Sequence, residues 1–162
     1  MLLVGCASTP TAPTATGAAK GARPNVVTRA TAPRPDSHQA VVWAMAFLGV
    51  PYQPGGNTPE QGFDCSGFTR HVFAHSLGVQ LPRRAEQQAQ NAGLPEVARD
   101  DLLPGDLVFF NTQNRAFSHV GIFVGQGRFV HSPREGAAIR IDDMRLPYWE
   151  SRFEGGRRAP LQ

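Results

Sequence analysis

The chain has 162 residues, of which 41% are hydrophobic and 18% are charged, a composition that suits one globular domain with a single core. No apolar run approaches the roughly 20 residues that cross a bilayer, so the sequence offers no transmembrane helix. The net charge of +3 gives a mild preference for anionic surfaces, but Lys and Arg are not clustered with stacking aromatic residues, so we expect no nucleic-acid partner.

The first six residues, "MLLVGC", are similar to the end of a bacterial lipoprotein signal, in which the cysteine becomes the lipid acceptor. A complete signal needs a charged segment and an apolar core of about 7 to 15 residues, and only five residues precede Cys6. Either a longer natural start is missing, or residues 1–6 are an ordinary apolar terminus. In the first case we expect lipid attachment at Cys6 and an exported protein, anchored in the periplasm to the outer membrane of a Gram-negative bacterium.

Residues 7–36 are rich in Ala, Thr and Pro and contain few large apolar side chains. Such a segment cannot repay the entropy of ordering, so we expect a disordered linker. About 30 residues of this kind have an end-to-end distance on the order of 30 Å, which lets a domain reach material near a membrane.

The domain is expected to occupy residues 37–162 and to begin with a helix over residues 37–50. Ser37 is a favourable N-cap for this helix. Four apolar residues recur at helical spacing and predict its buried face: Val41, Ala44, Met45 and Leu48. Three prolines and three glycines then predict a loop over residues 51–63.

A second helix is predicted from Cys65 to about Gly78, with Asp64 as its N-cap, and a short helix is predicted within residues 81–90. Beyond it the pattern changes to short β-rich segments bounded by Gly, Pro or Asn. The four predicted strands are "GDLVFF" (105–110), "HVGIFVG" (119–125), "GRFVHS" (127–132) and "AAIRID" (137–142). Helices followed by an antiparallel sheet predict an α+β fold.

Cys65 is predicted in the first turn of the second helix, where free N–H groups and the positive end of the helix dipole favour a thiolate. Such a position lowers a cysteine pKa and is typical of a nucleophile. Two alternatives stay open from the residues alone. Cys65 could be a small buried hydrophobe, or it could form a disulfide with Cys6 in an oxidising compartment.

His119 and His131 lie twelve residues apart, on either side of the turn signal "GQG". A hairpin centred near Gly125 would place them directly opposite each other on one face of the sheet. His131 would then hydrogen-bond one imidazole nitrogen of His119 while the other nitrogen faces Cys65. A one-residue shift in register would separate the two histidines, and each would merely cover part of a sheet face.

His71 and His75 have the i, i+4 spacing of two metal ligands on a helix. The stretch "HVFAH" lacks the glutamate of the zinc-protease motif, and no third ligand has a suitable spacing. We therefore interpret the pair as part of a solvated or edge-of-core helix face and expect no metal.

Residues 37–162 resemble the NlpC-type family of papain-like cell-wall cysteine peptidases. The resemblance rests on motifs in the family's order: "PYQPGG", "FDCSGF", "LPR", "LLPGDLVFF", "SHVGIFVG", "RFVHS" and "PYWESRF". It implies a papain-like fold, with N-terminal helices packed on the antiparallel sheet. It also implies Cys65 as the nucleophile, His119 as general base and later acid, and His131 as the residue that orients His119.

The resemblance further implies a set of substrate contacts: Tyr52, Asp64, Ser66, Arg83 and Ser118. Members of the family often carry a serine or threonine shortly after this arginine. The stretch "RRAEQ" has Ala85 there instead, so one hydroxyl contact of the family is missing.

The implied reaction is hydrolysis of a peptide bond in the stem peptides of peptidoglycan, through a Cys65 thioester and without any cofactor. The backbone N–H of Cys65 is the expected oxyanion donor, helped by the Tyr52 hydroxyl. We expect a monomer whose partners are peptidoglycan and, through Cys6, a membrane. Two other classes stay open: amide or ester acyl transfer on another substrate, and a catalytically idle wall-binding module.

Overall fold

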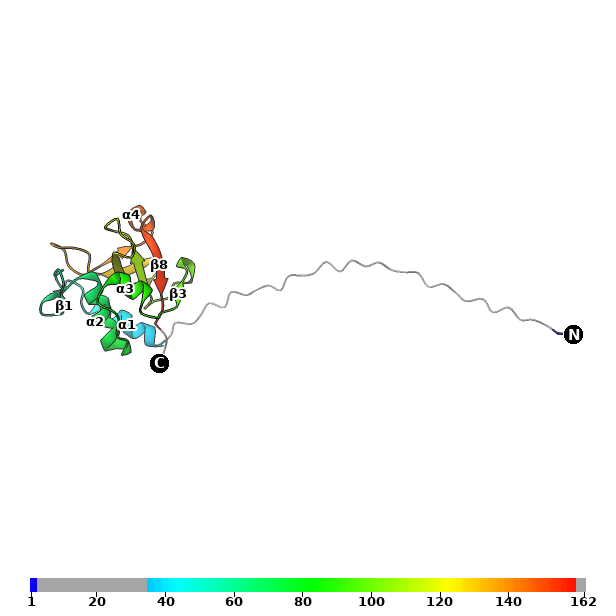
Figure 1. The fold of residues 1–162 in the computed structure, drawn as a ribbon. Coiled ribbons are helices and arrows are strands. Elements are labelled where there is room, and N and C mark those ends of the chain that lie inside the picture. Colours follow the sequence, from blue (N-terminus) through cyan, green and yellow to red (C-terminus); the bar gives the residue numbers. More distant parts are fainter. Residues whose placement is uncertain (3–34, 160–162) are drawn as a thin grey trace. The chain divides into compact units, whose positions relative to one another are not determined.

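The computed structural model describes residues 1–2 and 35–159, and Figure 1 shows how its helices and strands are arranged. The expected lipid attachment at Cys6 and nearly all of the expected linker lie outside these residues. In chain order the elements are α1 (Pro35–Met45), β1 (Asn57–Thr58), β2 (Gly62–Phe63), α2 (Cys65–Leu77), α3 (Ala85–Gln90), β3 (Glu96–Val97), the 3-10 helix η1 (Arg99–Asp101), β4 (Leu107–Phe110), β5 (His119–Gly125), β6 (Arg128–His131), β7 (Arg140–Asp143), α4 (Pro147–Glu150) and β8 (Phe153–Arg157). Within the described part of the chain, no helix has the length and apolar character needed to cross a membrane.

The sheet has six strands in the order β3-β8-β4-β5-β6-β7, and every neighbouring pair is antiparallel. The four strands predicted from the sequence are its centre and one edge. Strands β3 and β8 were not predicted, because one has two residues and the other reads "FEGGR", with glycines in place of β-branched residues. The predicted loop before α2 contains the short β1–β2 hairpin.

The two faces of the sheet are covered differently. On one face α1 and α2 pack against a core that includes Phe109 and Ile122. On the other face Trp149 of α4 packs edge-on against Phe110 and Phe129. Helices and an antiparallel sheet sharing one core confirm the predicted α+β fold.

The predicted start and end of α2 are confirmed. The Asp64 carboxylate accepts a hydrogen bond from the Gly67 N–H at 2.7 Å, which is the N-cap interaction. At the other end Gly78 adopts the left-handed conformation, with φ 66°, and its N–H donates to the carbonyl of Phe73. Cys65 is therefore the first residue of the helix.

The prediction for α1 was partly wrong. The helix begins at Pro35, so Ser37 lies inside it instead of capping it, and it ends at Met45. The fully buried side chains are Ala40 and Ala44, whereas Met45 and Leu48 are 36% and 42% exposed. Two small residues one turn apart let α1 approach its neighbours closely, so the larger side chains of the predicted face remain at the surface.

The first residues of α3 and β7 also differ from the predicted ones, for local reasons. The helix predicted within residues 81–90 forms only from Ala85, because the chain through Arg84 is extended. The strand predicted over residues 137–142 begins only at Arg140, since Ile139 and its neighbours exchange backbone hydrogen bonds with the segment around Val50 instead.

A substitution at Gly67 tests the close packing at the start of α2. A Cβ on Gly67 would lie 2.1 Å from the carbonyl oxygen of Gly56, a backbone atom that cannot rotate away. We expect Gly67→Ala to lower the free energy of unfolding by about 3 kcal/mol, measured by urea denaturation.

Gly93→Ala is the matched control for this prediction. Gly93 has φ 66° and nothing within 4 Å of an added Cβ, so alanine there meets only left-handed backbone strain of about 1 to 2 kcal/mol. An equal loss of stability in the two variants would contradict the steric explanation.

Candidate active site

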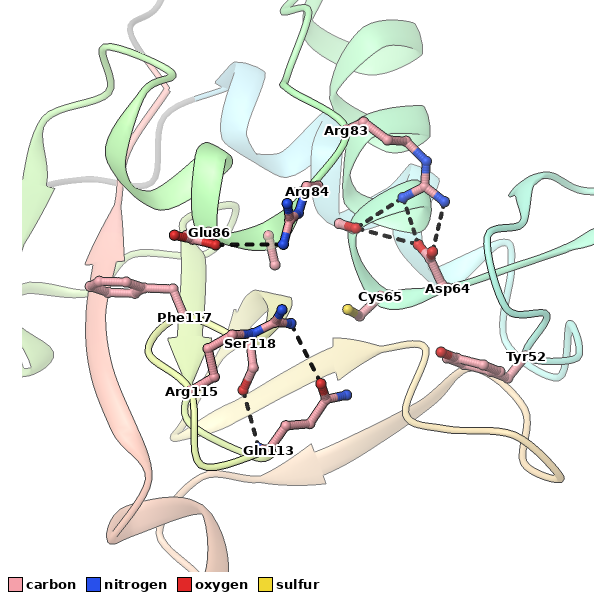
Figure 2. Close-up of a pocket in the computed structure, with 12 residues that line it drawn as sticks. Tyr52, Asp64, Cys65, Arg83, Arg84, Glu86, Gln113, Arg115, Phe117 and Ser118 are labelled. Atoms are coloured by element: carbon pink, nitrogen blue, oxygen red, sulfur yellow. Dashed lines mark hydrogen bonds and ion pairs between the residues drawn. The ribbon is translucent and has the colours of Figure 1, made fainter.

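Cys65 is a free, half-buried thiol that lines an open cavity, as Figure 2 shows. The cavity has a volume of about 420 Å³. It is lined by Cys65 together with all five side chains that the sequence suggested as substrate contacts: Tyr52, Asp64, Ser66, Arg83 and Ser118. These residues come from four separate stretches of the chain, and the fold brings them to one place.

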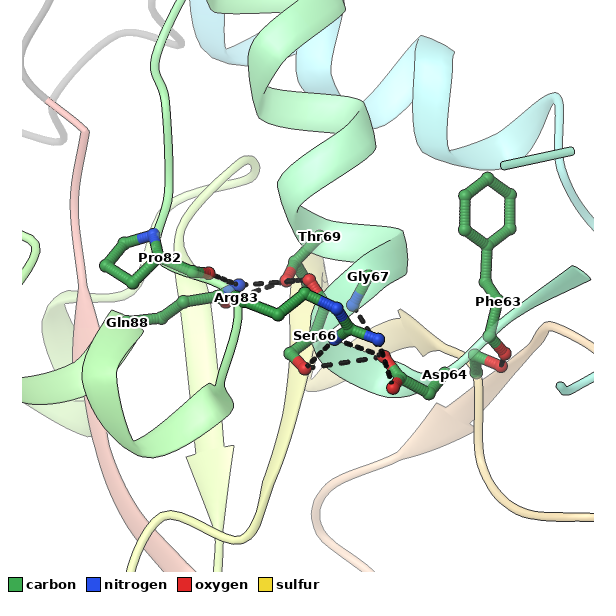
Figure 3. A network of polar contacts seen from close by, with 9 residues as sticks. Phe63, Asp64, Ser66, Gly67, Thr69, Pro82, Arg83 and Gln88 are labelled. Carbon is green, nitrogen blue, oxygen red and sulfur yellow. Dashed lines mark hydrogen bonds and ion pairs between the residues drawn. The ribbon is translucent and has the colours of Figure 1, made fainter. Parts of the chain in front are cut away.

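A charged cluster fixes the side of the cavity above Cys65, as Figures 2 and 3 show. The Arg83 guanidinium donates to both carboxylate oxygens of Asp64, at 3.0 and 2.6 Å, and to the Ser66 hydroxyl at 3.0 Å. Paired bonds of this kind set the orientation of both groups. The carboxylate that caps α2 therefore also holds the chain that follows α2.

Gln88 supports this cluster from within the core, and the sequence reasoning missed it. Its side-chain amide donates to the carbonyls of Ser66 and Pro82, at 3.0 and 2.9 Å, and accepts from the Thr69 hydroxyl at 2.8 Å (Figure 3). Gln88 is fully buried. The one available signal was its place three residues after Ala85 and one before Ala89, on the buried side of α3.

Ser118 lines the cavity, but its hydroxyl is already engaged with the loop before β5. It accepts hydrogen bonds from the backbone N–H groups of Thr112 and Gln113, at 2.9 and 3.2 Å. This places Ser118 as a residue that shapes the cavity wall. Ala85 also lines the cavity and presents a methyl group where a hydroxyl is frequent in the family.

His119 and His131 lie on one face of the sheet, with their Nε2 and Nδ1 atoms 2.7 Å apart. The prediction that they pair directly was wrong, because Ile122 pairs with Val130 and the two histidines are thus offset by two residues. A bulge between Phe123 and Gly125 accompanies this offset. An even offset keeps both side chains on the same face, so the predicted contact forms along the diagonal.

The histidine pair is enclosed, and it continues to a third group that the sequence reasoning missed. His119 and His131 are 4% and 0% exposed, and Trp149 stacks on the His119 ring at a centroid distance of 5.6 Å. The Nε2 atom of His131 lies 3.0 Å from a carboxylate oxygen of Asp142 on β7. The sequence showed Asp142 only as a polar residue near the end of a predicted strand.

The position of Cys65 relative to β5 is set by backbone contacts. Hydrogen bonding from the backbone of Val120, the residue after His119, stabilises the ionised sulfur, as does the backbone of Ser66. Cys65 thus lies beside the first residues of β5. The Nε2 atom of His119 is used by His131, and the Nδ1 atom has no hydrogen-bond partner among residues 35–159.

The electrostatics differ from the sequence prediction of a thiolate. Burial, followed by the nearby Asp64 carboxylate, raises the pKa of the Cys65 thiol to about 11. Burial and the neighbouring His131 lower the pKa of His119 well below its usual value of 6.5. At neutral pH the free protein therefore holds a neutral thiol and a neutral imidazole, because desolvation and the Asp64 charge outweigh the backbone hydrogen bonds and the Arg83 charge that favour the thiolate.

His71 and His75 lie side by side on α2. Their rings stack at a centroid distance of 4.1 Å, and the Nδ1 of His75 lies 2.8 Å from the carbonyl oxygen of His71. Among the residues that the structure describes, no group of three or more His, Cys, Asp or Glu side chains is placed to hold a metal ion.

A cysteine at the start of a helix, packed beside a strand that carries a buried histidine, is the arrangement of the papain-like cysteine peptidases. The model of the NlpC/P60 family matches residues 49–158, and the chain belongs to that family. The resemblance seen in the sequence motifs is thereby confirmed.

Individual relatives and solved structures are similar over most of the described domain. The chain is 45% identical over 116 residues to the gamma-DL-glutamyl hydrolase of Bacillus subtilis, covering 71% of this chain and 27% of that protein. It is 39% identical over 116 residues to the murein DD-endopeptidase MepH of Escherichia coli, covering 71% of this chain and 43% of the relative. A crystal structure of an NlpC/P60 family protein from Bacillus cereus superposes with a TM-score of 0.70 at 32% identity, covering 78% of this chain and 41% of the other. The chain thus spans less than half the length of each of these proteins.

The raised pKa of Cys65 leads to a prediction about how the rate of its alkylation depends on pH. In a Cys6→Ala protein, where Cys65 is the remaining cysteine, inactivation by iodoacetamide should accelerate steadily from pH 6 to pH 9, because the thiolate fraction rises toward a pKa of about 11. The rate is measured by mass spectrometry of the modified protein at timed intervals.

The unfolded protein provides the control for this prediction. In denaturant the same thiol regains its ordinary pKa, so at pH 7 it should react faster than in the folded protein. A rate that is already maximal at pH 5 in the folded protein would instead indicate a preformed thiolate–imidazolium pair.

Proposed function

We propose that this protein is a cysteine endopeptidase that hydrolyses peptide bonds in the stem peptides of peptidoglycan. The observation that carries the proposal is the position of Cys65, which faces an open polar cavity beside the first residues of β5, where His119 lies. Membership in the NlpC/P60 family supports the substrate class, since both relatives named above are described as hydrolases of glutamyl or murein peptide bonds.

The reaction begins when the Cys65 sulfur attacks the substrate carbonyl while its proton passes to the Nδ1 of His119. The resulting oxyanion accepts a hydrogen bond from the backbone N–H of Cys65, at the start of α2. Burial and the nearby Cys65 raise the pKa of Tyr52, so its hydroxyl stays protonated at neutral pH and is a second donor at the cavity.

The thioester forms when the carbon–nitrogen bond breaks and His119 returns its proton to the leaving amine. His119 then takes a proton from water as the water attacks the thioester carbonyl. Collapse of this second intermediate releases the carboxylate product, and the proton on His119 returns to the sulfur. No step requires a metal or an organic cofactor.

The cavity gives a basis for choosing the substrate. Its wall carries the Asp64–Arg83 pair, and Arg83 remains 35% exposed, so a charged donor faces a peptide ligand. Stem peptides carry free carboxylates and amines, which such a paired site can orient. The two relatives act on different linkages by name, so the bond that is cut here has to be read from the products.

Digestion of purified peptidoglycan tests the proposal. The wild-type protein should release muropeptides with newly formed carboxyl and amino ends, and mass spectrometry of these fragments identifies the bond. His119→Ala should lower kcat by about 10²- to 10⁴-fold, because general base catalysis contributes that much, and Cys65→Ala should release nothing.

A second cysteine variant provides the matched control for digestion. Cys6→Ala changes a residue outside the domain and should cut as the wild type does. Full digestion by Cys65→Ala would refute the thioester mechanism. Intact peptidoglycan together with turnover of a simple thioester or amide would favour acyl transfer on another substrate.

We further propose that the protein is exported and held at a membrane by lipid on Cys6, with residues 7–36 as a flexible tether in the periplasm. The support is the sequence "MLLVGC" and the Ala, Thr and Pro composition that follows it. An enzyme that acts on the wall has to stay close to it, and a tether with a reach on the order of 30 Å allows this.

Cell fractionation tests the anchor. With a complete signal peptide ahead of residue 1, the protein should sediment with membranes, and in Gram-negative cells with the outer membrane. Cys6→Ser should shift it to the soluble fraction or stop its processing, while leaving the digestion of peptidoglycan in vitro unchanged. A soluble wild-type protein with an unmodified Cys6 would contradict the anchor.

A further inference from the structure

Three side chains form a continuous hydrogen-bond chain across β5, β6 and β7. The Nε2 of His119 lies 2.7 Å from the Nδ1 of His131, and the Nε2 of His131 lies 3.0 Å from Oδ2 of Asp142. Arg140 holds the same carboxylate from the side, with its Nε 3.0 Å from Oδ1 and its terminal nitrogen 3.1 Å from Oδ2. The chain therefore ends on a carboxylate whose position is fixed.

The chemistry of that last group determines where each proton lies. Hydrogen bonds from His131 and Arg140 hold the pKa of Asp142 well below its ordinary value, so it is an ionised carboxylate that only accepts. His131 must therefore carry its proton on Nε2. Burial lowers the pKa of His131, so the ring is neutral at neutral pH and its Nδ1 is an acceptor.

The protonated nitrogen of His119 follows in the same way from that of His131. Because the Nδ1 of His131 accepts, the Nε2 of His119 must donate and must carry the proton of that neutral ring. The Nδ1 of His119 is then an unprotonated nitrogen with a free lone pair. This is the tautomer that a base for the Cys65 thiol requires.

We propose that Asp142 is a positioning residue, which sets the direction of this hydrogen-bond chain and so leaves the Nδ1 of His119 free to accept the proton of Cys65. This role rests on the proposed function, in which His119 is the general base. Asp142 acts through His131 and contacts neither the substrate nor the sulfur.

The negative charge of Asp142 also affects the proton transfer from Cys65 to His119. When His119 takes the proton it becomes an imidazolium in an enclosed site, next to the rings of Trp149 and Phe110. Burial disfavours this charged ring, and the negative charge of Asp142 favours it by raising the pKa of His119 against that effect. The carboxylate therefore stabilises the charge that forms during attack.

The neighbouring carboxylate provides a matched control. Asp143 follows Asp142 on β7, and alternation along the strand turns it to the other face, where it pairs with Arg145 at 2.6 Å. Asp143→Ala removes the same charge from the same strand without touching a histidine. It should leave turnover and both imidazole tautomers unchanged.

The experiment compares full-length wild type, Asp142→Ala, Asp142→Glu and Asp143→Ala. Nitrogen-15 NMR of histidine-labelled protein reads the protonated nitrogen of each ring, and steady-state kinetics on muropeptides separates kcat from KM. In the wild type both His119 and His131 should be protonated on Nε2. Asp142→Ala should mix the tautomers of His131 and lower kcat about 10- to 100-fold with KM nearly unchanged, and Asp142→Glu should recover most of the loss.

The outcomes separate this role from the proposed function, since the NMR measurement needs no substrate. Protonation of His131 on Nδ1 in the wild type would overturn the role of Asp142, as would unchanged tautomers and kcat in Asp142→Ala. An equal loss in Asp143→Ala would also overturn it, because it would show a general effect on β7. Suppose the wild-type protein leaves peptidoglycan intact but shows these tautomers, and Asp142→Ala mixes them. That result would refute the proposed function and support the proposed role of Asp142 in the hydrogen-bond chain.

Discussion

The Asp64 carboxylate connects the segments on which the cavity depends. It accepts the Gly67 N–H that starts α2, and it binds both ends of the Arg83 guanidinium fork. Cys65, the proposed nucleophile, is the next residue along the chain, so its position follows from this cap. The same negative charge lies beside the Cys65 sulfur and raises its pKa, with Arg83 acting in the opposite direction. The Asp64 carboxylate that positions Cys65 thus also opposes ionisation of the Cys65 thiol.

The raised pKa of Cys65 affects how the proposed reaction can begin. Because the Cys65 thiol and the His119 imidazole are both neutral in the resting protein, the proposed mechanism has the proton move as the sulfur attacks the carbonyl. Such a step depends on a base that is already oriented and already in the correct tautomer. The enclosed ring of His119, stacked on Trp149 and bonded to His131, is oriented before a substrate arrives, and the proposed hydrogen-bond chain supplies the tautomer.

Local signals in the sequence were enough for the features that depend on a few neighbouring residues. The Asp64 cap and the Gly78 end of α2 are of this kind, and the even spacing of the histidines placed them on one face. The features that sequence reasoning missed depend on distant parts of the chain. The bulge after Phe123 sets the register, and Asp142 reaches His131 only through the pairing of β6 with β7. The Cys65 pKa likewise depends on burial by the folded domain, which is the largest cause of its rise.

Strand β7 is the last strand in the sheet order, and its outer side faces no further strand among the described residues. Exposed strand edges offer free backbone groups to other chains and promote aggregation, and charged side chains are a common protection against it. Arg140, Asp142 and Asp143 supply three charges on this four-residue strand. Asp142 and Arg140, which we propose to orient the histidines, thus also place charge where a strand of another molecule could add to the sheet. Loss of the Asp142 charge is therefore expected to affect solubility as well as turnover, whereas loss of the Asp143 charge should affect solubility alone.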